Sequence, residues 1–196
     1  MKHFLYTIVF FLGFTLSAHA QLETHPTPIW EGIVKSEADI ENDHRLVKRS
    51  LELTNGDRQK AVEFAVRLAW ERIGRNDPNG AIRRFNQAWL IDPEFPDIFW
   101  GFAIATHIRG DDLEKVERWF LKTEEAVPPN ARLFTDHGRV LEERKMPEKA
   151  RKLFERAIAV DPNYPPAHVG MMQIAQAIGD TELFEKHQSI HDGLTN

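Results

Sequence analysis

Cysteine is absent from all 196 residues of the sequence. A catalytic thiolate, a disulfide framework and a thiolate-ligated metal are therefore excluded. Small exported domains often depend on disulfides, so a cysteine-free chain outside the cytosol must obtain its stability from packing. If this protein is exported, its composition suits a bacterial periplasm better than a eukaryotic extracellular space.

An excess of positive charge is also missing. Lys and Arg number 25 against 30 Asp and Glu, which gives a formal net charge of −5. General nucleic-acid binders need an excess of cations to displace counterions from phosphates. We therefore expect no nucleic-acid partner. The negative net charge favours solubility and gives no information about the fold.

Motifs that carry catalysis are lacking as well. The sequence has no glycine-rich phosphate loop, no nucleophile elbow and no His-Glu-x-x-His. His187 and His191 are four residues apart, a spacing that can place two metal ligands on one helix face. No third ligand is placed by the sequence, so we expect neither an enzyme nor a metal or other cofactor. A small hydrolase or metalloprotein that uses these two histidines is the alternative.

The one long apolar run lies at the N-terminus. Lys2 and His3 precede an almost wholly apolar stretch at residues 4–16, and Ala18-His19-Ala20 forms a small-x-small site. This is the layout of a secretory signal peptide, and the run is shorter than the roughly 20 residues that span a bilayer. We predict a signal peptide at residues 1–20, a periplasmic or secreted mature protein, and no membrane span after cleavage. A retained membrane anchor is the alternative.

Residues 21–35 show no hydrophobic period and contain Pro26, Pro28 and Gly32. We interpret this stretch as an extended lead-in whose Trp30 and Ile33 contact the first helix. A disordered tail is an equally supported alternative.

From residue 36 onward, apolar residues recur every three or four positions, which favours amphipathic helices. Pro, Gly and Asp separate the periodic segments, and Asp92-Pro93 ends one because a residue before proline avoids the helical region. No useful alternation with period two occurs, so we expect no sheet. The predicted fold class is all-α.

Four positions return 69 residues later with the same residue types. The matching sets are Ala81, Phe85, Ala88, Pro93 and Ala150, Phe154, Ala157, Pro162. Half of that interval is about 34 residues, a degenerate copy lies between, and such a period indicates a stacked array of small units. Each helical hairpin of the array buries its apolar face only when a neighbour covers it.

These residues resemble the tetratricopeptide repeat family over roughly residues 62–190. The unit at residues 131–164 matches closely, whereas the preceding unit departs from the pattern at Lys115 and Trp119. The resemblance implies a right-handed superhelical solenoid of antiparallel hairpins with three to four repeats. The expected domain, residues 36–192, comprises a capping helix and four repeats: 36–53, then about 62–95, 96–130, 131–164 and 165–192.

The family register also implies a concave groove lined by the first helix of each unit. Its inward positions are Val66, Trp70, Trp100, Ile104, His107, Thr135, Arg139, Val169, Gln173 and Gln176. Two tryptophans on one surface would anchor a partner, and Arg139 with His107 could hold a carboxylate or a peptide carbonyl. The alternatives are that both tryptophans pack between units and that Arg139 is a solvated surface residue.

We therefore expect an exported, non-enzymatic scaffold or adaptor that holds a peptide or a partner helix in its groove. The expected partner is another envelope protein. The alternative is an accessory or regulatory subunit of a cell-envelope enzyme or secretion machine, which binds through its outer face or its N-terminal segment. The sequence leaves the oligomeric state open.

Overall fold

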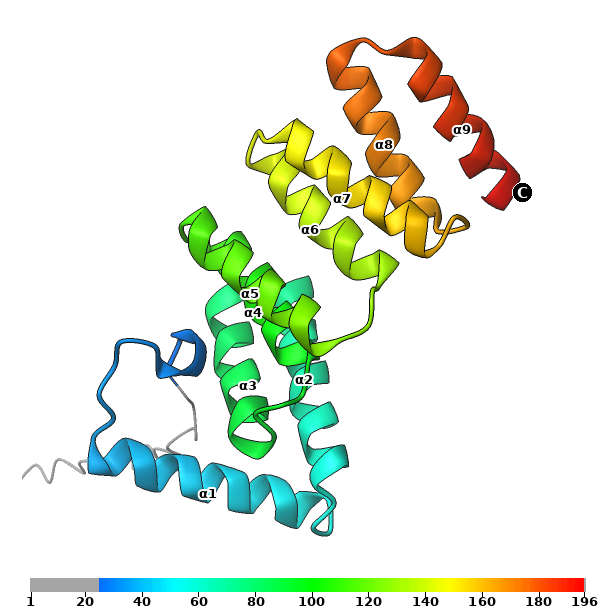
Figure 1. Ribbon diagram of the computed structural model, residues 1–196. Helices are drawn as coiled ribbons and strands as arrows, with labels where there is room; N and C mark the ends of the chain where they lie inside the picture. The colour runs from blue at the N-terminus through cyan, green and yellow to red at the C-terminus, as the bar shows by residue number, and fades with distance from the viewer. Residues whose placement is uncertain (1–24, 196) are drawn as a thin grey trace, which may run out of the picture.

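The structure is a computed structural model that describes residues 25–195 (Figure 1). Over these residues the chain is helical, with no β-strand, as expected. The elements are η1 (Pro28–Trp30), α1 (Glu37–Leu53), α2 (Arg58–Gly74), α3 (Pro78–Ile91), α4 (Asp97–Arg109), α5 (Leu113–Ala126), α6 (Ala131–Glu143), α7 (Pro147–Val160), α8 (Pro165–Ile178) and α9 (Thr181–Thr195).

The predicted signal peptide at residues 1–20 lies outside the described residues. Within residues 25–195, none of the helices combines the length and the hydrophobicity that a bilayer span requires.

Local sequence sets the helix ends. At the start of α3, the Asp77 carboxylate accepts a hydrogen bond from the Gly80 N–H, and Pro78 occupies the first turn, where a missing N–H costs nothing. Helices α3 and α7 end alike, at Asp92 (φ −144°, ψ 99°) and Asp161 (φ −138°, ψ 96°). In both cases the following proline forces the aspartate out of the helical region.

Consecutive helices pair as α2–α3, α4–α5, α6–α7 and α8–α9, and the pairs follow one another along the molecule (Figure 1). Phe85 and Phe154 are fully buried where one pair meets the next. The Phe85 ring lies against Gly101 of α4, and the Phe154 ring lies against Gly170 of α8. The aromatic residues that recur in the sequence therefore pack against glycines at the junctions of an all-α solenoid.

Helix α6 joins the two hydrophobic cores of the protein. Leu133 and Val140 belong to the core that α2–α5 form, whereas Phe134 and Leu141 belong to the core with α7 and α8. His137 is buried between them and stacks on Phe120 of α5, with ring centroids 4.3 Å apart and an interplanar angle of 6°. This single helix thus fixes how the first two hairpins meet the last two.

The N-terminal segment, which the sequence left open between a lead-in and a disordered tail, packs on the helices. The described lead-in is not a free tail, because η1 lies against α3 and Trp30 is buried there. The segment packs against α3, where Asn86 hydrogen-bonds its main chain. Its link to α1 is polar: Lys35 pairs with Asp43 and lies over the Trp30 ring.

Candidate functional site

A hollow of about 430 Å³ lies between α4 and α6. We call it the α4–α6 hollow, and its walls are Ile104, His107, Ile108, Asp136, Arg139, Val140 and Glu143. Helical spacing explains this set, because residues three or four apart share one face of α4 or α6. The hollow therefore combines aliphatic with charged side chains.

Three of the predicted groove residues line this hollow. Ile104 and His107 come from α4, and Arg139 comes from α6. The prediction thus found both helices that form the hollow. It missed Ile108, Asp136, Val140 and Glu143, although Asp136 and Glu143 are three and four residues from Arg139 and so share its helix face.

Three other predicted groove residues are buried. Val66 is 6 % exposed, Trp100 9 % and Thr135 0 %. Trp100 meets Trp70 edge to face, with centroids 6.0 Å apart, and Trp70 in turn contacts Phe85. Both tryptophans therefore pack between units, because two large rings in contact bury more apolar surface than two exposed ones.

The predicted residues of α8 lie outside the hollow. Val169 is half-buried, Gln173 is exposed, and Gln176 lines a separate hollow of about 290 Å³ beside Phe184. The structure thus does not bring all ten predicted positions into one site.

A hydrogen-bond chain fixes His107 at one end of the hollow. Its Nε2 lies 2.7 Å from the Glu143 carboxylate, and its Nδ1 accepts from Arg144 Nε at 3.3 Å. Because arginine can only donate, Nδ1 carries no proton and Nε2–H points to Glu143. Arg144 also donates to the Asp111 carbonyl, at 2.9 Å, which holds this chain against the α4–α5 turn.

Asp136 occupies the other side of the hollow. Burial raises the pKa of its carboxyl, and the positive charges of Arg132 and Arg139 oppose that rise. Arg132 lies 3.9 Å from Asp136 and places its guanidinium 4.9 Å from the centre of the Trp100 ring. Burial and the nearby Asp136 likewise raise the pKa of Tyr164, which precedes α8.

Arg139 differs from the other arginines around this hollow. It is exposed and forms no hydrogen bond or ion pair with another residue in the described part of the chain. Its planar guanidinium can donate to a carbonyl or pair with a carboxylate, and both groups occur in every peptide. Ile104, Ile108 and Val140 lie beside it and can receive an apolar side chain.

The two histidines considered as metal ligands do not share a site. His187 is buried and its Nδ1 lies 2.9 Å from Nδ1 of His168, whereas His191 contacts Asp192. Among residues 25–195, no three His, Asp or Glu side chains gather where they could hold a metal ion. The buried His168–His187 pair, which spacing alone did not reveal, instead ties α9 to α8.

Several solved structures resemble this one. PilF of Pseudomonas aeruginosa aligns with a TM-score of 0.60 and 19 % identity, over 69 % of this chain and 63 % of its own. MamA aligns with a TM-score of 0.58 and 14 % identity, over 82 % of this chain and 98 % of its own. YrrB is described as a TPR protein with an unusual peptide-binding site. It aligns with a TM-score of 0.53 and 17 % identity, over 71 % of this chain and 75 % of its own.

This chain has the tetratricopeptide-repeat fold. The likeness concerns the fold, because all three identities are low. The chain spans 63 % of the PilF chain, so PilF continues beyond the region they share. Neither a protein-family model nor a curated protein sequence matches the chain.

Proposed function

We propose that this protein is an exported, non-enzymatic scaffold that binds a peptide segment of another envelope protein in the α4–α6 hollow. The observation that carries the proposal is Arg139, a cation with no ion-pair partner among residues 25–195 that lies beside the aliphatic side chains of Ile104 and Val140. A peptide that enters the hollow supplies a carbonyl or carboxylate to Arg139 and an apolar side chain to Ile104 and Val140. Support for export comes from the signal-peptide layout of residues 1–20.

The tetratricopeptide fold supports the scaffold role, because stacked hairpins create an extended surface from elements that need no catalytic machinery. YrrB, which shares the fold, is described as having a peptide-binding site. The electrostatics of the hollow also suit a peptide. Arg139 brings a positive charge to the hollow, and Asp136 and Glu143 bring negative charges. Such alternation favours the dipoles of a main chain over a ligand with one sign of charge.

Capture of partners from an envelope extract tests the proposal. The wild-type chain, an Arg139→Glu variant and a Lys152→Glu variant serve as baits, and bound proteins are quantified by mass spectrometry. Both substitutions reverse one exposed charge, but only Arg139 lines the hollow. We expect Arg139→Glu to lose specific partners that Lys152→Glu retains, with equal melting temperatures. Identical partner lists from all three baits would reject the hollow as the binding site.

The second candidate is an accessory subunit that binds through its outer face or its N-terminal segment. One observation favours it: residues 25–31 are attached to α3, α4 and α5 by directed hydrogen bonds. For this candidate, deleting residues 21–35 should abolish partner capture while the far-ultraviolet helical signal persists. Retention of the partner after the deletion would contradict it.

A further inference from the structure

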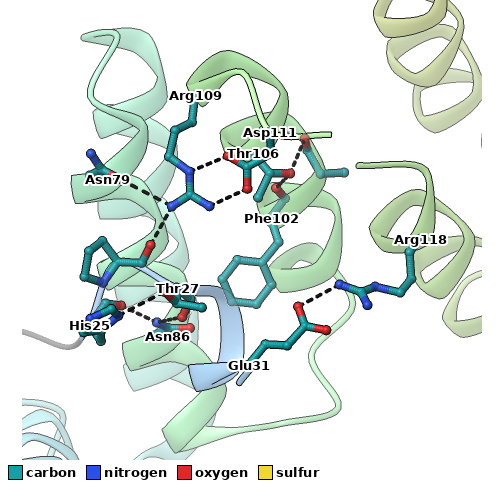
Figure 2. A network of polar contacts seen from close by, with 12 residues as sticks. His25, Thr27, Glu31, Asn79, Asn86, Phe102, Thr106, Arg109, Asp111 and Arg118 are labelled. Atoms are coloured by element: carbon teal, nitrogen blue, oxygen red, sulfur yellow. Dashed lines mark hydrogen bonds and ion pairs between the residues drawn. The ribbon is translucent and has the colours of Figure 1, made fainter. Parts of the chain in front are cut away.

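Asn86 of α3 holds the main chain of a segment far away in sequence. Its Oδ1 accepts the Ile29 N–H at 2.7 Å. Its Nδ2 donates to the carbonyls of His25 (2.7 Å) and Thr27 (2.8 Å) (Figure 2). The side chain is fully buried, and both of its donor hydrogens are used on this one segment. Because each of these hydrogen bonds joins Asn86 to a main-chain atom, Asn86 recognises the path of the main chain and not the side chains of the segment.

Two arginines extend this contact. Arg109, at the end of α4, donates to the Pro26 carbonyl while Asp111 holds its guanidinium at 2.6 and 2.7 Å (Figure 2). Arg118 of α5 pairs with Glu31 at 2.7 Å. We call residues 25–31 the strap, and Asn86, Arg109 and Arg118 the strap site. The strap site shares no residue with the α4–α6 hollow.

The strap adopts a strained conformation in order to lie there. Ile29 and Trp30 both have positive φ angles, 43° and 59°. A left-handed conformation is unfavourable for residues with a Cβ, and a β-branched residue such as Ile29 is a genuine outlier there. Such strain persists only where the surroundings hold it, and here Asn86 holds the Ile29 N–H and burial holds Trp30. This strain weakens the hold of the strap on its own site, which favours displacement of the strap by another segment.

The bonds also define the chemistry that the site accepts. Three carbonyls of the strap, those of His25, Pro26 and Thr27, accept hydrogen bonds, but only one N–H, that of Ile29, donates to the strap site. Proline lacks an N–H, so it suits a site whose hydrogen bonds go mainly to carbonyls, and its fixed φ angle restricts the main chain of the segment. The strap itself carries Pro26 and Pro28 between these contacts. Trp30 adds a buried aromatic group, and Glu31 adds a carboxylate for Arg118.

We propose that the strap site binds a proline-containing segment of another protein that carries an aromatic and an acidic residue, and that the strap is its displaceable cover. The partner segment takes over the carbonyl contacts to Asn86 and Arg109. Its aromatic side chain enters the place of Trp30, and its carboxylate pairs with Arg118. This binding is independent of the proposed function of the α4–α6 hollow.

A peptide with the sequence of residues 24–31, labelled for fluorescence polarisation, probes the site in the full chain. Covering a site lowers its apparent affinity by the fraction of time that it is open. Trp30→Ala loosens the strap without altering α3, α4 or α5, so we expect this variant to bind the peptide at least about tenfold more tightly than the wild type. Glu31→Ala, which removes only the ion pair with Arg118, should give a smaller gain in the same direction.

Adding Asn86→Ala to Trp30→Ala should remove peptide binding, while adding Arg139→Glu should leave it unchanged and so separate this site from the hollow. Circular dichroism verifies that each variant keeps its helices. Failure of the folded Trp30→Ala chain to bind the peptide would overturn the proposal, as would equal binding with and without Asn86. Sedimentation of the wild-type chain as a strap-exchanged dimer would show that the occupant is a second copy and would overturn the assignment to a separate partner.

Discussion

The ring of Phe154 on α7 occupies the space that a side chain at Gly170 on α8 would need. A Cβ atom at Gly170 would lie 2.5 Å from the ring, well inside any normal contact. The same relationship holds 69 residues earlier, where a Cβ at Gly101 would lie 2.0 Å from the Phe85 ring. The sequence repeat thus corresponds to a repeated physical contact: a glycine lets the next hairpin approach, and an aromatic ring fills the space.

Gly170→Ala should therefore destabilise the protein by about 1–3 kcal/mol, because the added methyl group forces the Phe154 ring or α8 to move. Urea denaturation followed by circular dichroism measures the change in unfolding free energy. Gly74→Ala is the matched control, since Gly74 is helical and faces open space. Alanine has the higher helix propensity, so this control should be neutral or gain up to about 1 kcal/mol. Equal destabilisation by both variants would refute close packing at Gly170.

Phe154→Ala should cost about 3–5 kcal/mol, because it leaves a cavity between α6, α7 and α8. Phe154 is fully buried, and Gly138 and Gly170 flank its ring. Lys152→Ala on the same helix provides the control, since Lys152 is exposed and a surface change there should stay within about 0.5 kcal/mol. Similar losses at the two positions would show that the junction does not depend on the aromatic ring.

Ser36→Ala should destabilise α1 by about 1 kcal/mol, because Ser36 and Asp39 form a reciprocal capping box at its start. The Ser36 hydroxyl and N–H also lower the pKa of the Asp39 carboxyl. Amide hydrogen exchange in the first turn of α1 reports the loss locally. Ser189→Ala, at an exposed position in α9, should leave that exchange unchanged. Unaltered protection of the first turn in Ser36→Ala would exclude the capping role.

The free energy of unfolding should decrease as the pH falls below about 6.5, because of the His168–His187 contact. Burial, the neighbouring His168 and the charges of Lys186 and Arg151 lower the pKa of His187 from 6.5, so the folded state favours the neutral ring. The unfolded chain takes up a proton near pH 6.5, so it binds more protons than the folded chain below that pH. The stability associated with His187 is therefore complete above about pH 6.5 and decreases as the pH falls toward the lowered pKa.

Thermal melting as a function of pH measures this effect. His187→Gln should flatten part of the decline, and His137, whose pKa burial also lowers, contributes to the remainder. His44→Gln, at an exposed position on α1, should keep the wild-type profile. If melting temperature depends on pH in His187→Gln as it does in the wild type, the His168–His187 pair does not contribute to the pH dependence of stability.

Helix ends and repeat junctions were predictable from the sequence because they depend on near neighbours. Asp92 and Asp161 leave the helix because the next residue is proline, a constraint that acts between adjacent residues. Phe85 and Phe154 recur with the repeat, and stacking identical hairpins must bury equivalent residues in equivalent ways.

The candidate site was predictable only in part. The family register places Ile104, His107 and Arg139 on one face, but it does not say which aromatic rings close over each other. Trp100 is buried because Trp70 and Arg132 cover it, and those contacts depend on the angle between successive hairpins. Asp136 and Glu143 share the periodic face of Arg139, and only the presence of the hollow distinguishes them from ordinary surface charges.

The sequence by itself determined that the chain forms stacked helical hairpins, because turn residues, helical periods and the repeated Ala-Phe-Ala pattern act over short distances or return at a fixed interval. Only the tertiary structure decided what those hairpins bring together: Asn86 with the backbone of Ile29, and His168 with His187. Hydrogen bonds between distant segments depend on how whole helices are placed, and no local pattern records which buried polar group will meet which.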